Sequence, residues 1–354
     1  MDKREYGELR LSHLPVRPDW LARRTEAALD PGLPIIDPHH HLWGRPRTRY
    51  LIDELSEDIG APDQGGHNVV ATVFVQCGAM YRAHGPEALK PVGETEFVAG
   101  QGAMADSGLY GPSRCNAAIV CHIDLTSGEE TARVVDAHLA VAGGRLRGVR
   151  HATAHDPSPD VRTSSANPPA GLLADASFRR GFAQLSRYGL SFDAWLYHPQ
   201  IGELAALARA FPDTTIVLDH CGGPLGVGPY AGRRDEVFAF WRASIRDMAQ
   251  ASNVVVKLGG LGMAVSGYEF HRQDDPPASQ TLAEAWRPWF ETCIAAFGVE
   301  RCMFESNFPV DKGSCSYTVL WNAFKRVAAG VSAAERAALF HDTAARVYRI
   351  TPTI

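Results

Sequence analysis

The 354-residue sequence lacks the features of exported, membrane-spanning and nucleic-acid-binding proteins. Its seven cysteines are odd in number and form no Cys-x-x-Cys pair, so a disulfide framework is not expected. No segment approaches the ~18 consecutive apolar residues of a membrane span, and the start, "MDKREYGELRLSHLP", has no apolar stretch of signal-peptide length. A net charge of −5 gives no broad attraction to nucleic acid. We therefore expect a reduced, cytoplasmic protein that binds a small molecule, with neither a nucleic-acid nor a membrane partner.

Short β-rich segments alternate with helical patterns eight times along the chain. Their near-continuous Val, Ile and Leu content requires burial on both faces, which is typical of parallel strands. Eight alternations favour a (β/α)8 TIM barrel, a fold of ~250 residues or more in one domain. The expected strands are 33–41, 68–77, 116–125, 146–153, 190–198, 214–222, 253–261 and 301–309.

The expected helices have recognisable starts, and the chain before the first strand stands apart. Phe178 and Phe182 recur at helical spacing behind Asp175, and Ser332 with Glu335 has the spacing of a capping box. We predict a single barrel domain over 33–354 and an N-terminal extension over 1–32. The extension is expected to cap the bottom of the barrel or to contact a partner subunit of a homodimer or larger homo-oligomer.

Polar side chains gather where the predicted strands end. In this architecture the chemistry lies at the carboxyl ends of the strands, because the remaining strand residues fill the core. A barrel built for packing alone has little use for such a set. The strand-end residues are His39, His40, His41, His122, Arg150, His151, His198, Asp219, His220, Lys257, Glu305 and Asn307.

The segment "DPHHHLW" is the strongest local signal for a metal. Residues i and i+2 of a strand face the same side, so His39 and His41 can share one ion while His40 points outward. His198 and His220 end neighbouring strands, and neutral imidazoles suit Zn²⁺. The alternative is that these histidines are solvated loop residues or satisfied buried groups.

Two cationic side chains interrupt apolar strands. Lys257 lies within "NVVVKLGG" and is costly to bury unpaired, so it either reaches solvent along its stem or faces inward. If it faces inward, it pairs with a carboxylate or binds a substrate anion. Arg150 offers a bidentate contact to a carboxylate.

The chain resembles the amidohydrolase superfamily, in the branch called amidohydrolase family 2. The motifs that carry the resemblance are "DPHHHLW", "GVRH" at 148–151, "LDHCGGP" and "RCMFESNFPVD", and it extends over residues 33–350. The branch holds 2-pyrone-4,6-dicarboxylate lactonase, fuconolactonase-like lactonases, sulfomuconolactone hydrolases and zinc-dependent decarboxylases. The resemblance implies that His39 and His41 are metal ligands and that His198 and His220 are the histidines of the fifth and sixth strands.

The eighth strand departs from the family pattern. The family usually reads Gly-Ser-Asp-Trp-Pro, where the aspartate is the general base and, with a metal, also a ligand; this chain reads Glu305-Ser306-Asn307-Phe308-Pro309. An asparagine cannot accept the proton. We therefore predict a linked exchange in which Glu305 is the base or a ligand and Asn307 positions water or substrate. The alternative is that both only satisfy polar groups of the barrel.

These features predict a hydrolase that acts on a lactone or another ester of a small carboxylated or aromatic-derived compound. A divalent metal, zinc by preference, or histidines and an arginine without metal would polarise the carbonyl. Decarboxylation or hydration, amide hydrolysis, and a non-catalytic binding barrel are the alternatives. The expected catalytic residues are Glu305, Asn307, His220 and His198, and the expected ligands are His39, His41, His198 and Glu305. The expected substrate-binding residues are Arg49, Tyr50, Tyr81, His122, Arg150, His151 and Lys257.

Overall fold

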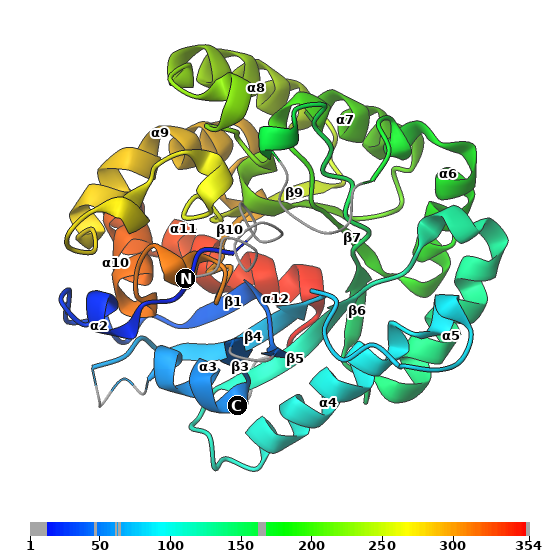
Figure 1. The fold of residues 1–354 in the computed structure, drawn as a ribbon, viewed down its shortest axis with the longest axis horizontal. Helices are drawn as coiled ribbons and strands as arrows, with labels where there is room; N and C mark the ends of the chain where they lie inside the picture. Colours follow the sequence, from blue (N-terminus) through cyan, green and yellow to red (C-terminus); the bar gives the residue numbers. More distant parts are fainter. Residues whose placement is uncertain (1–12, 46–47, 61, 63–64, 162–167, 352–354) are drawn as a thin grey trace.

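Eight parallel strands form one sheet in chain order, and helices surround it (Figure 1). The computed structural model describes residues 13–45, 48–60, 62, 65–161 and 168–351. Each strand overlaps one of the eight segments expected from the sequence, so the predicted (β/α)8 barrel is confirmed. The strands are β1 (Ile35–His40), β4 (Val69–Val75), β5 (Arg114–Cys121), β6 (Leu146–Val149), β7 (Ser191–Ala194), β8 (Ile216–Leu218), β9 (Val254–Leu258) and β10 (Cys302–Phe304).

The sheet closes between its first and last strands, just beyond the end of β10. The Asn307 N–H donates to the His39 carbonyl oxygen over 2.9 Å, and the His41 N–H donates to the Phe308 carbonyl oxygen over 2.7 Å. A parallel bridge also joins His40 to Phe308. The histidine segment and the atypical strand-8 segment are therefore direct neighbours across the closing seam.

Helices cover the outside of the sheet, and their starts agree with the sequence. The Asp175 carboxylate accepts hydrogen bonds from the backbone N–H groups of Ser177 and Phe178, and Ser332 forms the predicted capping box with Glu335. No helix among the described residues is both long and apolar enough to cross a bilayer. The helices are α2 (Pro18–Leu21), α3 (Ile52–Ile59), α4 (Val92–Asp106), α5 (Thr131–Val141), α6 (Ala176–Phe182), α7 (Ile201–Ala210), α8 (Arg234–Met248), α9 (Ser279–Phe297), α10 (Tyr317–Val327), α11 (Ala333–Ala337) and α12 (Thr343–Tyr348).

The amino ends of the strands are covered by the C-terminal helix α12. Arg114, at the start of β5, donates to the carbonyl oxygen of Thr351 over 2.8 Å, and Arg349 donates to that of Gly189, just before β7, over 2.8 Å. The Tyr348 side chain is buried and donates its hydroxyl to Asp193 inside the barrel over 2.7 Å. The cap therefore comes from the opposite end of the chain to the one expected.

The described part of the N-terminal extension runs along the outside of the barrel. Trp20 donates to the carbonyl oxygen of Gln273 over 3.0 Å, in the segment that connects β9 to α9 on the carboxyl side of the sheet. Farther along, the Leu29 N–H donates to Asn322 on α10 over 2.7 Å. The expectation that residues 1–32 cap the barrel bottom is wrong for these residues, because they pack against α10 and the segment after β9. A contact with a partner subunit stays a prediction.

Candidate active site

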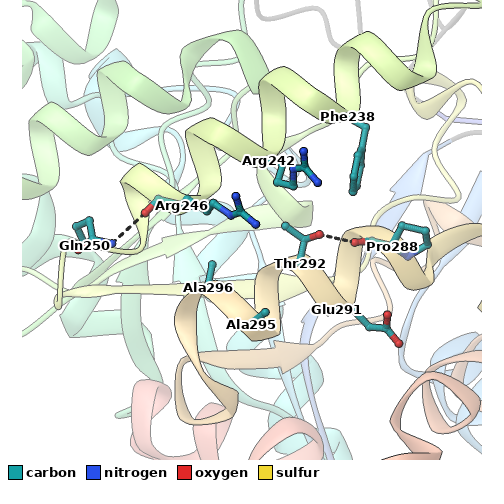
Figure 2. A pocket seen from close by; sticks show the side chains of 9 residues that line it. All are labelled: Phe238, Arg242, Arg246, Gln250, Pro288, Glu291, Thr292, Ala295 and Ala296. Atoms are coloured by element: carbon teal, nitrogen blue, oxygen red, sulfur yellow. Dashed lines mark hydrogen bonds between the residues drawn. The ribbon is translucent and has the colours of Figure 1, made fainter.

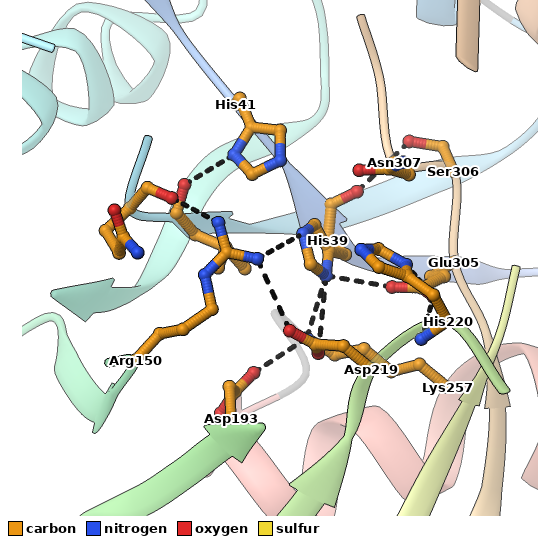
Figure 3. Close-up of polar contacts among 12 residues, drawn as sticks. His39, His41, Arg150, Asp193, Asp219, His220, Lys257, Glu305, Ser306 and Asn307 are labelled. Carbon is orange, nitrogen blue, oxygen red and sulfur yellow. Dashed lines mark hydrogen bonds and ion pairs between the residues drawn. The ribbon is translucent and has the colours of Figure 1, made fainter. Parts of the chain in front are cut away.

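Charged and imidazole side chains from most of the strands meet at the carboxyl end of the barrel (Figure 3). Within this cluster the exposed fractions are 7% for Arg150, 3% for His220 and 0% for His39, Lys257 and Glu305. Two further carboxylates, from Asp193 and Asp219, are equally buried. Such a concentration of buried charge is costly unless each group is paired.

His39 lies at the centre of the cluster, and both of its ring nitrogens face cationic donors. Lys257 Nζ lies 3.1 Å from His39 Nδ1, and Arg150 Nη1 lies 3.3 Å from His39 Nε2. Burial and the nearby Lys257 charge lower the pKa of His39. A neutral imidazole has one lone pair, so it can accept from only one of the two donors.

Lys257 faces inward and is paired with carboxylates. Its ammonium lies 2.7 Å from Asp193 Oδ2 and 3.0 Å from Asp219 Oδ1. Burial opposes its charge, but the two carboxylates outweigh burial and raise the pKa of Lys257. Arg150 lies 3.3 Å from the other oxygen of Asp219. Of the alternatives predicted for Lys257, the structure shows pairing with carboxylates.

His220 and Glu305 form a tightly bonded pair. His220 Nδ1 lies 2.7 Å from Glu305 Oε1, and the His220 backbone N–H donates to the same oxygen over 3.0 Å. Because Oε1 is a carboxylate acceptor, Nδ1 carries the proton and Nε2 carries the lone pair. Burial raises the pKa of Glu305, but His220 and His39 lower it by more, to about 2. The charge interaction with His220 is the largest of the effects that lower this pKa, followed by that with His39.

Two glycines after β9 make room for this pair. A Cβ on Gly259 would lie 2.4 Å from Glu305 Cγ, and a Cβ on Gly260 would lie 2.5 Å from the His220 ring. Gly260 also has φ +69°, in the left-handed region that favours glycine. The two glycines of "KLGG" therefore leave free the space that His220 and Glu305 occupy.

Asn307 is bonded to Asp311 rather than to Glu305. Its Nδ2 donates to Asp311 Oδ1 over 2.8 Å, and the Gly262 N–H donates to Asp311 Oδ2 over 3.0 Å. Burial raises the pKa of Asp311 to about 7. Glu305 and Asn307 are both buried at the site as predicted, but their side chains have different partners.

Of the other two predicted histidine ligands, His41 lies near His39 and His198 does not. The His39 and His41 rings lie 4.9 Å apart, as expected for i and i+2 residues, and His41 Nδ1 donates to the Val75 carbonyl oxygen over 2.7 Å. His198 instead accepts from the Leu225 N–H over 3.3 Å and packs against Tyr230 at 5.1 Å. The described contacts of His198 are not with the cluster.

Three of the predicted substrate-binding residues form a wall beside Arg150. The Tyr81 ring stacks on His122 at 6.4 Å, and His122 packs edge-on against His151 at 5.5 Å. His122 Nδ1 lies 3.1 Å from the Arg150 carbonyl oxygen. Tyr81 is 37% exposed, so the wall reaches the protein surface.

Arg49 and Tyr50 are engaged elsewhere. They belong to β3 (Thr48–Tyr50), which pairs with β2 (Trp43–Arg45) in a hairpin after β1. Arg49 pairs with Glu54 over 2.7 Å at the surface, and Tyr50 donates to Asp58 over 2.7 Å. The structure does not bring these two residues into the cluster.

Three carboxylates of the site were not assigned a role by the sequence. Asp193 lies in the middle of β7, Asp219 directly precedes His220, and Asp311 follows Pro309 by two residues. Asp219 and Asp311 each lie within one of the motifs that carry the family resemblance, and this was the signal that could have drawn attention to them. Asp193 became recognisable only through its contact with Lys257.

The described surface is also hollowed outside this cluster. A groove of about 650 Å³ runs between α8 and α9 on the outside of the barrel, lined by Arg242 and Arg246 on one side and Thr292 on the other (Figure 2). A cavity of about 250 Å³ is lined by Leu225, Tyr230 and Ser266 among others, next to the contacts of His198. No residue of the His39 cluster lines either of them.

Comparison with known proteins identifies the family. The model of the amidohydrolase family matches residues 36–350. The chain belongs to this family. It is 35% identical over 338 residues to an uncharacterized protein, y4mH, from Sinorhizobium fredii, covering 89% of this chain and 98% of that protein. It is 29% identical over 326 residues to an L-fucono-1,5-lactonase from Burkholderia multivorans, covering 89% and 96%.

A solved amidohydrolase structure from Burkholderia multivorans with bound zinc is similar to this amidohydrolase in fold. The TM-score is 0.68 at 27% sequence identity, over 90% of this chain and 99% of the other. The likeness agrees with the barrel described above. The zinc belongs to that protein, so its place here depends on the donors that this chain offers.

The donor set of this amidohydrolase fits a divalent metal. Ligand atoms of His39, His220 and Glu305 all lie within 4.8 Å of one another. Glu305 Oε2 is buried without a hydrogen bond and lies beside His39 Nδ1 at 2.8 Å. Two imidazoles and a carboxylate form a donor set typical of zinc. The group differs from the predicted one, since it contains His220 and neither His41 nor His198.

Proposed function

We propose that this amidohydrolase hydrolyses a lactone or another carboxylic ester of a small carboxylated or aromatic-derived compound. The observation that carries the proposal is the His220–Glu305 pair at the carboxyl end of the barrel, which His39 links to Arg150. The 29% identity to an L-fucono-1,5-lactonase supports an ester as the bond that is cleaved.

His220 is the proton acceptor in this proposal, and Glu305 orients it. The Nδ1–H···Oε1 bond of 2.7 Å leaves the lone pair on Nε2 and stabilises the imidazolium that forms when His220 takes a proton from water. Glu305 is fully buried, and its Oε1 is occupied by two His220 donors. This assignment replaces the sequence-based hypothesis that Glu305 is itself the base.

Arg150 and the wall beside it bind the substrate in this proposal. Arg150 is the most exposed member of the cluster at 7%, so its guanidinium is the charge best placed to bind the carbonyl oxygen or a carboxylate. Tyr81, His122 and His151 offer aromatic faces and polar edges next to it. Such a surface suits a small ring that carries oxygen substituents.

A zinc ion, where present, would be held by His39, His220 and Glu305 and would polarise the carbonyl and acidify a bound water. With zinc in place, His220 and Glu305 would serve as ligands, so their roles as proton acceptor and orienting group belong to the metal-free site, while Arg150 would orient the ester in both. The seven cysteines are all free thiols, which agrees with the reducing cytoplasm that we propose as the location.

Acid release from a panel of lactones and esters, followed with a pH indicator, tests the function. We expect turnover of at least one small carboxylated lactone and a loss of at least ~100-fold in Glu305→Gln, because the His220 tautomer is no longer fixed. The surface variant Glu236→Gln, whose carboxylate pairs with exposed Arg233, should match the wild type. Release of CO₂ without ester cleavage would favour the decarboxylase, and binding without turnover would favour a non-catalytic barrel.

A further inference from the structure

The Asn307 side chain is fixed in one orientation by a buried carboxylate. Asn307 is 1% exposed and Asp311 0% exposed, and the Asn307 Nδ2 donates to Asp311 Oδ1 over 2.8 Å. The backbone also binds the two residues together, because the Asp311 N–H donates to the Asn307 carbonyl oxygen over 3.1 Å. The contact is therefore part of a folded turn.

Asp311 has a built pocket of its own. The Gly262 N–H donates to Asp311 Oδ2 over 3.0 Å, and a Cβ on Gly262 would lie 2.7 Å from that oxygen. Ser314 holds Gly262 in place by donating its hydroxyl to the Gly262 carbonyl oxygen over 2.7 Å. With one oxygen committed to Gly262, the other is held toward Asn307.

This arrangement decides which side of the Asn307 amide is available. A primary amide offers hydrogen-bond donors on nitrogen and an acceptor on oxygen. The nitrogen is bound to Asp311, and none of the described residues donates a hydrogen bond to the Asn307 side-chain oxygen. Asn307 has φ +54° and lies beside His39 in the cluster (Figure 3), in a conformation that asparagine tolerates well.

We propose that Asp311 is a positioning residue that makes Asn307 present its carbonyl oxygen to the water that attacks the ester. The inference rests on the proposed function. One hydrogen of the water is accepted by His220 Nε2 and the other by Asn307 Oδ1, so a lone pair of the water oxygen faces the substrate carbonyl. As that oxygen bonds to the carbonyl carbon, its first proton passes to His220 and then to the departing alkoxide oxygen.

The isosteric variant Asp311→Asn isolates this role from packing. The new amide keeps the Gly262 hydrogen bond through its oxygen, so its NH₂ group faces Asn307. Asn307 then turns its own oxygen toward position 311 and its NH₂ group toward the water. The hydrogen bonds within the turn survive, but the acceptor offered to the water becomes a donor.

Exchanging the two side chains restores the acceptor. In Asn307→Asp alone, two carboxylates face each other at the distance of the present hydrogen bond. In the double variant N307D/D311N, the amide at position 311 donates to the carboxylate at position 307, whose second oxygen faces the water. The hydrogen bond between the two side chains is kept with its direction reversed, and the Gly262 N–H still donates to the residue at position 311.

Steady-state kinetics of the wild type, D311N, N307D and N307D/D311N on the best panel substrate test the proposal. We expect D311N to lower kcat at least ~10-fold with KM within about threefold, because only the attack step loses its acceptor. N307D/D311N should recover at least ~10-fold over the D311N single variant, and the surface control Asp247→Asn should match the wild type. Wild-type kcat in D311N, or a double variant no faster than D311N, would overturn the proposal.

Melting temperatures at pH 8 give a readout that needs no substrate. N307D should lower the melting temperature by about 5 °C and the double variant should regain most of that loss, since a buried carboxylate pair that must take up a proton at pH 8 becomes a hydrogen-bonded pair with a single charge. If no panel substrate is turned over, the ester-hydrolase proposal fails. The melting temperatures of N307D and the double variant still test whether residues 307 and 311 are hydrogen-bonded to each other. Equal melting temperatures for N307D and the double variant would overturn the pairing, and recovered stability without recovered kcat would overturn the role toward water.

Discussion

At the residue scale, Lys257 shows how a costly side chain is accommodated. It interrupts an apolar strand, is fully buried, and contacts Asp193, Asp219 and the His39 ring within 3.1 Å. Replacing its ammonium would leave Asp193 buried without a cation and Asp219 paired with Arg150 alone. Lys257 therefore stabilises the buried carboxylates of Asp193 and Asp219, which lie beside the His39 ring.

Lys257→Met should lower the free energy of unfolding by about 3–5 kcal/mol, the cost of breaking a buried ion pair by removing one partner. Urea denaturation measures the change. As a control, Lys90→Met removes a lysine whose partner Glu87 is 85% exposed, and should change stability by no more than about 0.5 kcal/mol. A Lys257→Met protein as stable as the wild type would show that Asp193 and Asp219 do not need this cation.

At the element scale, the turn after β9 and the helix α4 shape the site without contributing chemistry. Gly259 and Gly260 clear space for Glu305 and His220. On α4, Glu94 accepts from the backbone N–H groups of Cys77 and Ala79 over 3.0 and 2.7 Å and so holds the segment after β4. The glycines and Glu94 therefore influence the site through the position of the backbone and not through a reacting group.

Gly260→Ala should displace the His220 ring and destabilise the fold by about 1–3 kcal/mol, because its Cβ meets the ring at 2.5 Å and its φ is +69°. Loss of acid release should accompany the change. Gly202→Ala on α7 is the matched control, since nothing lies within 4 Å of its Cβ, and should be neutral or slightly stabilising. Full activity in Gly260→Ala would contradict the packing argument.

Glu94 predicts a pH-dependent contribution to stability. Burial raises the pKa of Glu94 from its usual 4.5 to about 7, so the folded state holds a proton that the unfolded state releases earlier. Stability from this group is present below pH 4.5 and is lost as pH rises toward 7, by about 3 kcal/mol. Glu94→Gln can keep both backbone hydrogen bonds and should lack this loss. Urea denaturation at pH 4.5 and at pH 7.5 measures the free energy of unfolding of the wild type and of Glu94→Gln. An equal decrease between the two pH values in both proteins would contradict the prediction.

At the scale of the whole molecule, the sequence predicted the repeating pattern well and the individual contacts less well. Strand order follows from eight apolar segments with polar ends, and the i, i+2 rule correctly placed His39 beside His41. The partners of Lys257 and Asn307 could not be predicted, because they depend on how deep each strand lies in the barrel and on how the turn after β10 folds. The prediction that Arg49 and Tyr50 bind substrate failed because their side chains bond to Glu54 and Asp58 of α3.

The same limit explains the cap of the barrel. Residues 13–34 carry polar groups that find partners on α10 and after β9, whereas α12 brings buried Val347 and Tyr348 to the amino ends of the strands. Because the interior of such a barrel is filled by apolar side chains, the buried Val347 and Tyr348 suit its amino end. The position of α12 depends on how α10 and α11 lead the chain back from β10, which one sequence does not reveal.

The measurement that tests the central claim most directly is the rate of ester hydrolysis by His220→Asn. Asparagine tolerates the left-handed backbone at this position (φ +54°) and keeps a donor toward Glu305 but has no basic nitrogen. We predict a fall in kcat/KM of at least ~100-fold on the best lactone of the panel, with an unchanged melting temperature and with the surface control His341→Asn fully active. Undiminished hydrolysis by His220→Asn would contradict the assignment of His220 as the proton acceptor.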